Sequence, residues 1–156
     1  MKKQACCALV VCLGLAVGLG QAQVSSLTGL WKLNVARSSW GKKQKPVSVW
    51  VDIDHREPAL KYEGMVVDAN GDGRYFAFEG AVDGKESPFQ SPYGEGAITF
   101  RRLDPRSVTS VFRSGNGNVT ETVTMRLSRD GKVLTHRVRL KDPAGEMSWT
   151  EVYEKK

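Results

Sequence analysis

The chain contains few of the residues that carry out redox, metal or nucleophilic chemistry. Of its 156 residues, three are cysteines and two are histidines. The cysteines, Cys6, Cys7 and Cys12, all lie near the start of the chain. His55 and His136 form no H-x-H or H-x-x-x-H pair, and no nearby cysteine completes a zinc-ligand set. Because a nucleophile-elbow motif is missing as well, we expect neither an enzyme nor a bound cofactor.

Long hydrophobic runs are also missing, with one exception at the beginning. Two lysines precede an apolar run over residues 5–19, and small residues follow it at Gly20 and Ala22, as in a cleavage site. The run is about fifteen residues long, which is shorter than the roughly 20 that a membrane-spanning helix needs. We therefore predict a removable signal peptide at 1–22 and a mature domain at 23–156. The mature chain is expected to be periplasmic or secreted, without insertion into a membrane.

A concentrated basic surface is missing too. The formal net charge is +6, yet the lysines and arginines are spread along the chain. Small basic clusters occur only at Lys42-Lys43-x-Lys45 and Arg101-Arg102. Domains that bind nucleic acid carry a basic stripe with stacking aromatic residues. We therefore expect no nucleic-acid partner.

Turn signals, in contrast, are abundant. They recur about every ten residues and consist of Asp, Asn, Gly and Pro, whose backbone preferences suit tight hairpin turns. They are Asp72-Gly73, Asp83-Gly84, Asp104-Pro105, Gly115-Asn116-Gly117, Asp130-Gly131 and Asp142-Pro143-Ala144-Gly145. The runs between them alternate apolar and polar residues, as in VSVWVDID at 47–54, and no amphipathic helix is evident. This pattern predicts an antiparallel all-β domain.

The alternation predicts about nine strands. They fall at 28–35, 47–54, 59–67, 74–82, 97–103, 107–113, 119–128, 132–141 and 147–154. Residues 83–96, rich in Gly, Pro and Ser, are the longest predicted irregular connection and a candidate lid at a barrel mouth. Consecutive strands joined by tight turns favour an up-and-down barrel of about 8–10 strands, because closure removes unpaired edges. A two-sheet β-sandwich is the alternative.

Several segments of the chain resemble one protein family. The first predicted strand carries Gly29-Leu30-Trp31, a G-x-W motif placed where lipocalins and their calycin relatives have theirs. Four further segments add to it: W-K-L-N running into A-R-S at 31–38, R-L-D-P at 102–105, L-S-R-D-G-K-x-L-T at 127–135 and V-Y-E-K at 152–155. Together, over residues 28–156, they are similar to a family of small exported bacterial lipocalin-like proteins of largely unassigned function.

The resemblance implies a calycin-type β-barrel that closes at one end on Trp31. In such barrels the tryptophan packs against an arginine from a late strand, which implies Arg137 or Arg139 as its partner and Gly29 as a further structural residue. The chain departs from the pattern because it has no T-D-Y type motif, no C-terminal helix and no disulfide to hold its tail. Residues 36–46 are also too few for the helix pair that covers the barrel of fatty-acid-binding proteins.

Three aromatic residues fall in the two long predicted loops. Trp40 lies in the loop at 36–46, and Phe89 and Tyr93 lie in the segment at 83–96. Aromatic residues in loops are less easily explained as core residues and are typical of a cavity mouth. The leading hypothesis is that Trp40, Phe89 and Tyr93 bind a small, mainly apolar ligand at the barrel mouth. The alternative is a structural or protein-interaction module with a packed interior.

A calcium-loop motif lies between two predicted strands. Residues 68–79 match D-x-[DN]-x-[DN]-G-x5-E in full, with Asp68, Asn70 and Asp72 at the first three ligand positions. Such a loop needs a helix on each side, whereas both flanks here alternate as strands, which would carry Glu79 away from the turn. We interpret the segment as a hairpin turn, and weak calcium binding by Asp68, Asn70 and Asp72 is the third functional hypothesis.

Overall fold

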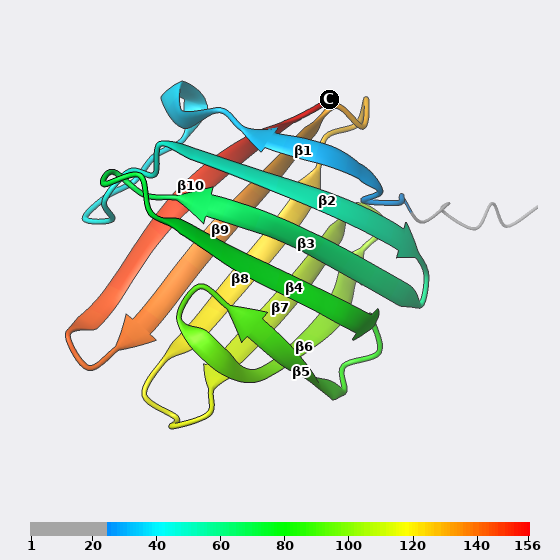
Figure 1. Ribbon diagram of the computed structural model, residues 1–156. Coiled ribbons are helices and arrows are strands. Elements are labelled where there is room, and N and C mark those ends of the chain that lie inside the picture. Colours follow the sequence, from blue (N-terminus) through cyan, green and yellow to red (C-terminus); the bar gives the residue numbers. More distant parts are fainter. Residues whose placement is uncertain (1–24) are drawn as a thin grey trace, which may run out of the picture.

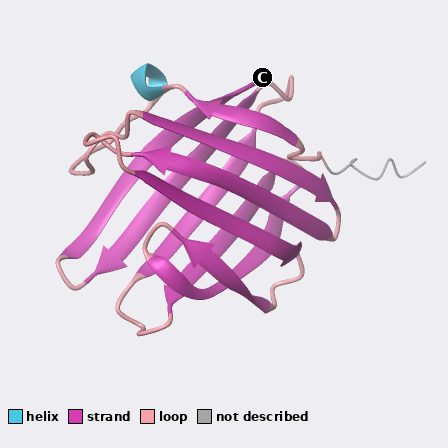
Figure 2. Ribbon diagram, in the orientation of Figure 1, coloured by secondary structure: helices cyan, strands magenta, loops and turns pink. Residues whose placement is uncertain are grey.

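Ten consecutive strands make up the computed structural model, which describes residues 25–156, and short connections join all of them except β1 and β2 (Figure 1). The strands are β1 (Gly29–Leu33), β2 (Ser48–Arg56), β3 (Ala59–Val67), β4 (Gly73–Ala81), β5 (Glu86–Ser91), β6 (Gly94–Asp104), β7 (Ser107–Ser114), β8 (Thr120–Leu127), β9 (Val133–Asp142) and β10 (Gly145–Lys155). One 3-10 helix, η1 (Val35–Arg37), follows β1 (Figure 2). No helix among the described residues is long and apolar enough to cross a membrane.

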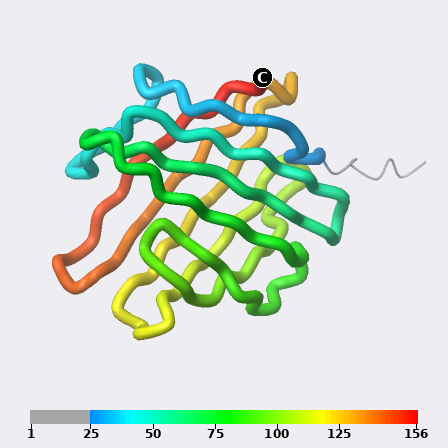
Figure 3. The backbone as a smooth tube through the Cα atoms, in the orientation of Figure 1, coloured from blue at the N-terminus to red at the C-terminus, as the bar shows by residue number. Residues whose placement is uncertain are grey.

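The ten strands close into a barrel. Each strand pairs antiparallel with the strand before it, and β10 returns to pair with β1, so the sheet has no free edge. The backbone tube in Figure 3 shows this meander as a continuous path around the barrel. The predicted all-β, up-and-down barrel is therefore confirmed, and the β-sandwich alternative is wrong.

One strand was missed by the sequence prediction. Residues 83–96 do not form an irregular lid, because β5 runs through them and pairs with β6 along its whole length. Pro88, which has no N–H to donate, lies within β5. On its other side, β5 pairs with β4 at a single position, Ala77 with Gln90, and forms no continuous ladder of backbone hydrogen bonds there. Because β5 contains a proline and is fully paired with β6 alone, its sequence resembles that of a loop.

Period-two alternation sends the apolar residues of each strand into the barrel. On β2, Val49, Val51 and Ile53 are buried, whereas Trp50 between them points outward and is 37 % exposed. A cluster of aromatic rings fills one side of the interior, with ring centres 4.6 to 6.5 Å apart. Its members are Tyr62, Phe76, Phe78, Phe89, Phe100 and Phe112.

Trp31 closes one end of the barrel. Its side chain is fully buried, and its indole N–H donates a hydrogen bond to the carbonyl oxygen of Leu27 at 2.9 Å. The ammonium of Lys155 lies 5.4 Å from the centre of the indole ring. Gly29 has a φ of 147°, and a Cβ there would overlap the Lys155 side chain. The G-x-W motif therefore combines a buried tryptophan with a positive φ that favours glycine.

Lys155, and not Arg137 or Arg139, supplies the cation beside Trp31. Both arginines occupy outward positions of β9 and are exposed, because they alternate with the buried Val138 and Leu140. The Arg139 side chain is paired on the outer surface with Glu146 at 2.7 Å. The implied arginine partner is therefore corrected to a lysine on the following strand, β10.

Candidate functional site

The barrel encloses a cavity of about 210 Å³. Side chains from most strands line it, together with residues 43–46 of the connection between η1 and β2. A cavity of ~150 Å³ is already large enough to admit a molecule the size of benzene. The interior is therefore not packed solid, in contrast to the alternative that the sequence left open. Much of the wall is apolar and is formed by Val49, Val51, Leu60, Ile98 and Val138.

All three aromatic residues singled out in the sequence lie on the cavity wall. Trp40 follows η1 and is buried, with an exposed fraction of 5 %. Phe89 points inward from β5, and its ring centre lies 5.6 Å from that of Phe112. Tyr93 lies in the short turn between β5 and β6. Closure of the barrel thus brings together two chain segments about fifty residues apart, as the sequence hypothesis required.

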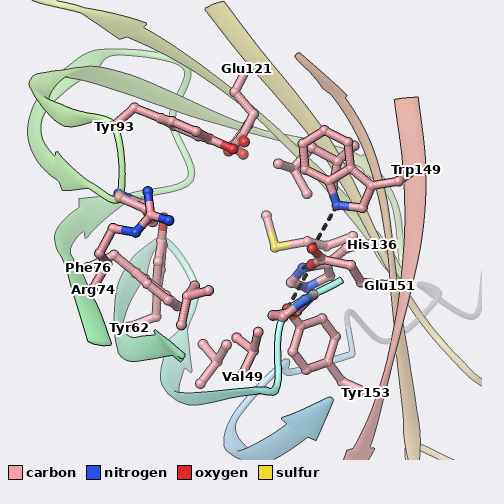
Figure 4. Close-up of a pocket in the computed structure, with 18 of the residues that line it drawn as sticks. Val49, Tyr62, Arg74, Phe76, Tyr93, Glu121, His136, Trp149, Glu151 and Tyr153 are labelled. Atoms are coloured by element: carbon pink, nitrogen blue, oxygen red, sulfur yellow. Dashed lines mark hydrogen bonds and ion pairs between the residues drawn. The ribbon is translucent and has the colours of Figure 1, made fainter. Parts of the chain in front are cut away.

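A hydrogen-bonded carboxylate lies deep in this cavity. Trp149, Glu151 and Tyr153 alternate along β10 and all line the cavity (Figure 4). The indole N–H of Trp149 donates to Oε1 of Glu151 at 2.7 Å, and the hydroxyl of Tyr153 donates to Oε2 at 2.7 Å. Because an indole N–H is only a donor, it fixes Oε1 as an acceptor. Burial raises the pKa of Glu151 above its ordinary value.

A second carboxylate, that of Glu121, projects from β8 into the same space. Figure 4 shows its carboxyl group beside the hydroxyl of Tyr93. Burial is the main cause that raises the pKa of Glu121 to about 7, and the negative charge of Glu151 raises it further. The cavity therefore contains two acidic groups that are poorly solvated and close enough to repel one another.

Lys43 brings a positive charge to this pair. Its ammonium lies 4.9 Å from the centre of the Trp149 ring and 5.5 Å from that of Tyr93, within the range of cation–π attraction. It also donates a hydrogen bond to the Tyr93 hydroxyl at 3.3 Å. The positive charge of Lys43 partly offsets the rise in the pKa of both Glu121 and Glu151.

His136 is the third titratable group on the wall. It lies opposite Glu151 in the pairing of β9 with β10, and its Nδ1 is 3.9 Å from Oε2 of that residue. Burial lowers the pKa of His136 to about 3, so the imidazole is neutral near pH 7. Its Nε2 is buried and has no hydrogen-bond partner among the described residues. This nitrogen is covered by protein atoms and is an unsatisfied buried polar group of the described structure.

Sequence reasoning missed this polar cluster. Glu121, His136 and Glu151 were not selected, and Lys43 was interpreted as part of a scattered basic surface. A usable signal is present in W-T-E-V-Y at 149–153, where a glutamate shares one strand face with two aromatic residues. An acidic residue at an inward position is rarely buried without a partner or a function.

The calcium-loop motif folds as a hairpin turn between β3 and β4. Oδ1 of Asp68 accepts hydrogen bonds from the backbone N–H groups of Asn70 at 2.9 Å and Asp72 at 3.1 Å. Glu79 lies far along β4, where it is paired with Lys61. No group of three or more His, Cys, Asp or Glu side chains suited to a metal occurs within residues 25–156. The Asp68 carboxylate therefore stabilises the turn itself, as Asx turns do.

Comparison with known proteins finds solved structures of similar fold. The chain matches no protein-family model and no curated protein sequence. A zebrafish ileal bile acid-binding protein complexed with cholic acid is similar, with a TM-score of 0.60 and 12 % identity over 85 % of this chain and 100 % of that one. A Schistosoma mansoni fatty acid binding protein in complex with arachidonic acid has a TM-score of 0.55 and 11 % identity, over 86 % and 98 %. As-p18, an extracellular fatty acid binding protein, has a TM-score of 0.56 and 16 % identity, over 83 % and 96 %.

At these identities the likeness concerns the fold. The described part of the chain is a closed antiparallel barrel, and these three structures of similar fold are a bile acid-binding protein and two fatty acid binding proteins. The class of protein is thus defined by a barrel whose interior holds a cavity.

Proposed function

We propose that the protein is an exported, non-enzymatic binding protein that takes a small, mainly apolar molecule into its barrel. The observation that carries this proposal is the cavity of about 210 Å³, whose walls are largely aliphatic and aromatic. Trp40, Phe89 and Tyr93 are the proposed contacts nearest the mouth. The lipid-binding neighbours support the same class of ligand.

Export is part of the proposal. The predicted signal peptide at 1–22 lies outside the described residues, so its support comes from the sequence pattern alone. The test is the intact mass of protein isolated from its source. We expect the mass of a chain that begins at Gln23. The mass of a chain that still contains residues 1–22 would contradict export by this route.

Binding is tested with a neutral apolar probe, N-phenyl-1-naphthylamine, whose fluorescence rises in an apolar site. Val123 lines the cavity from β8, whereas Val111 on β7 lies between the inward-facing Ser110 and Phe112 and points outward. We expect wild-type protein and Val111→Phe to bind the probe, and Val123→Phe to bind it at least about tenfold more weakly because the new ring fills the cavity. Equal binding by both variants would place the probe outside the barrel.

A further inference from the structure

The acidic groups of the cavity are not required for barrel closure. Glu121 comes from β8, which is paired on both sides, and Glu151 comes from β10, which is paired along almost its whole length with β9. Removing two carboxylates from water is costly unless positive charge or hydrogen-bond donors compensate. Glu151 has two such donors in Trp149 and Tyr153, whereas Glu121 has the Tyr93 hydroxyl beside it. Among the described residues, neither carboxylate forms an ion pair with a lysine or an arginine.

Lys43 shows what kind of group this part of the cavity accepts. A single ammonium lies beside the rings of Trp149 and Tyr93 and donates to the Tyr93 hydroxyl, on the same cavity wall as the two carboxylates. Aromatic faces and carboxylates together are the usual surroundings of bound ammonium groups. Beside the two acids, however, Lys43 supplies one positive charge, and Lys45, which also lines the cavity, is exposed. The site is therefore short of positive charge whenever both carboxylates are ionised.

A ligand with a carboxylate head group suits this interior poorly. Its negative charge would lie beside Glu121 and Glu151 in a desolvated space, where like charges repel strongly. Arg74, the basic residue drawn on the opposite wall in Figure 4, is about half exposed and is paired with Asp68 at 3.3 Å. Its charge is thus at the rim and already partly neutralised.

We infer that the cavity selects a cationic amphiphile: an amine whose ammonium lies between Trp149, Tyr93 and the carboxylates of Glu121 and Glu151, in the place of the Lys43 ammonium, with its apolar body against the aliphatic wall. This inference rests on the proposed function, because it names the ligand class for the same cavity. Lys43 then acts as a tethered occupant that the ligand displaces.

The test compares three probes with the same eight-carbon chain by isothermal titration calorimetry at about pH 8: n-octylammonium, octanol and octanoate. An amine of this type stays protonated there, since its pKa resembles that of lysine at ~10.4. We expect octylammonium to bind roughly tenfold or more tightly than octanoate, with octanol between them. Octanoate binding as tightly as octylammonium overturns the inference while leaving the apolar-ligand proposal intact. Failure of all three probes, octanol included, overturns both.

Variants test which residues cause the preference for octylammonium. Glu121→Gln removes a charge with almost no change of shape, and we expect it to weaken octylammonium binding roughly tenfold while octanol binding is unchanged. Glu86→Gln is the matched control, because Glu86 lies on the outer surface and is 62 % exposed. Lys43→Gln removes the tethered occupant and is expected to strengthen octylammonium binding. An equal loss for octylammonium in Glu121→Gln and Glu86→Gln would mean that only overall charge matters, and would overturn the assignment of the site.

Discussion

Replacing Glu121 by glutamine should make the stability of the barrel depend differently on pH. In the folded protein the pKa of Glu121 is about 7, against an ordinary value of 4.5. The folded state therefore holds this proton more tightly than the unfolded chain does. The resulting stabilisation is complete below pH 4.5 and is lost as the pH rises through about 7. Glutamine, which does not titrate, removes that loss.

The size of the effect follows from the width of the window. Each pH unit over which the two states differ by one bound proton is worth about 1.4 kcal/mol. From 4.5 to about 7, the free energy of unfolding of Glu121→Gln should thus rise relative to wild type. The gain is about 3 kcal/mol and levels off at higher pH. Any difference in contacts between protonated glutamate and glutamine adds an offset that is the same at every pH, so the change with pH isolates the titration.

Urea unfolding followed by tryptophan fluorescence measures this difference at several pH values between about 4.5 and 8. Glu86→Gln serves again as the surface control and should run parallel to wild type at every pH. A difference between Glu121→Gln and wild type that stays constant with pH would refute the reasoning. A difference that shrinks as pH rises would show that Glu121 is stabilised as a carboxylate in the folded barrel.

Three further predictions concern other residues. His136→Phe should gain stability relative to wild type as the pH falls from 6.5 toward about 3, because the folded barrel keeps this histidine neutral while the unfolded chain protonates it. The same urea titrations measure this gain. A difference that does not change with pH would contradict burial of the imidazole. Trp31→Phe should cost about 1–3 kcal/mol, since it leaves the Leu27 carbonyl without its buried donor; a loss below measurement in urea unfolding would count against Trp31 as the closing residue. Asp68→Ala should lower stability slightly through loss of its bonds to the turn, which the same urea titrations measure. Millimolar calcium should leave the melting temperature of the wild type unchanged, and a clear rise would revive the metal hypothesis.

The fold was predictable because its determinants are local. Alternation of apolar and polar residues in segments such as 47–54 indicates the strands, and turn residues such as Asp130-Gly131 indicate where the hairpins lie. β5 was missed for the same reason, since Pro88 and the surrounding Gly and Ser residues weaken the local signal. That strand exists through its non-local pairing with β6, which local propensity does not reveal.

The candidate site was predictable only in part. Trp40, Phe89 and Tyr93 were selected because aromatic residues outside strands need an explanation, and all three line the cavity. The choice of Arg137 and Arg139 failed because the side of β9 that faces inward was not known, and a shift of one residue reverses every side chain. Glu121 and Glu151 depend on the same choice of side, since an acidic residue on an alternating strand is ordinarily assigned to solvent.

The two halves of the barrel treat buried polar groups differently, and this contrast is the strongest reason to look for a ligand. At the closed end His55 is buried, and its Nδ1 accepts a hydrogen bond from the backbone N–H of Leu27 at 3.1 Å. The imidazole therefore helps to hold the segment just before β1 in place. On the cavity wall, Nε2 of His136 has no partner among the described residues, and Glu121 keeps a strongly raised pKa. A barrel selected for stability alone would carry apolar residues at these positions. Of these groups, the Glu121 carboxylate lines the cavity, where the ligand proposed above would supply the missing positive charge.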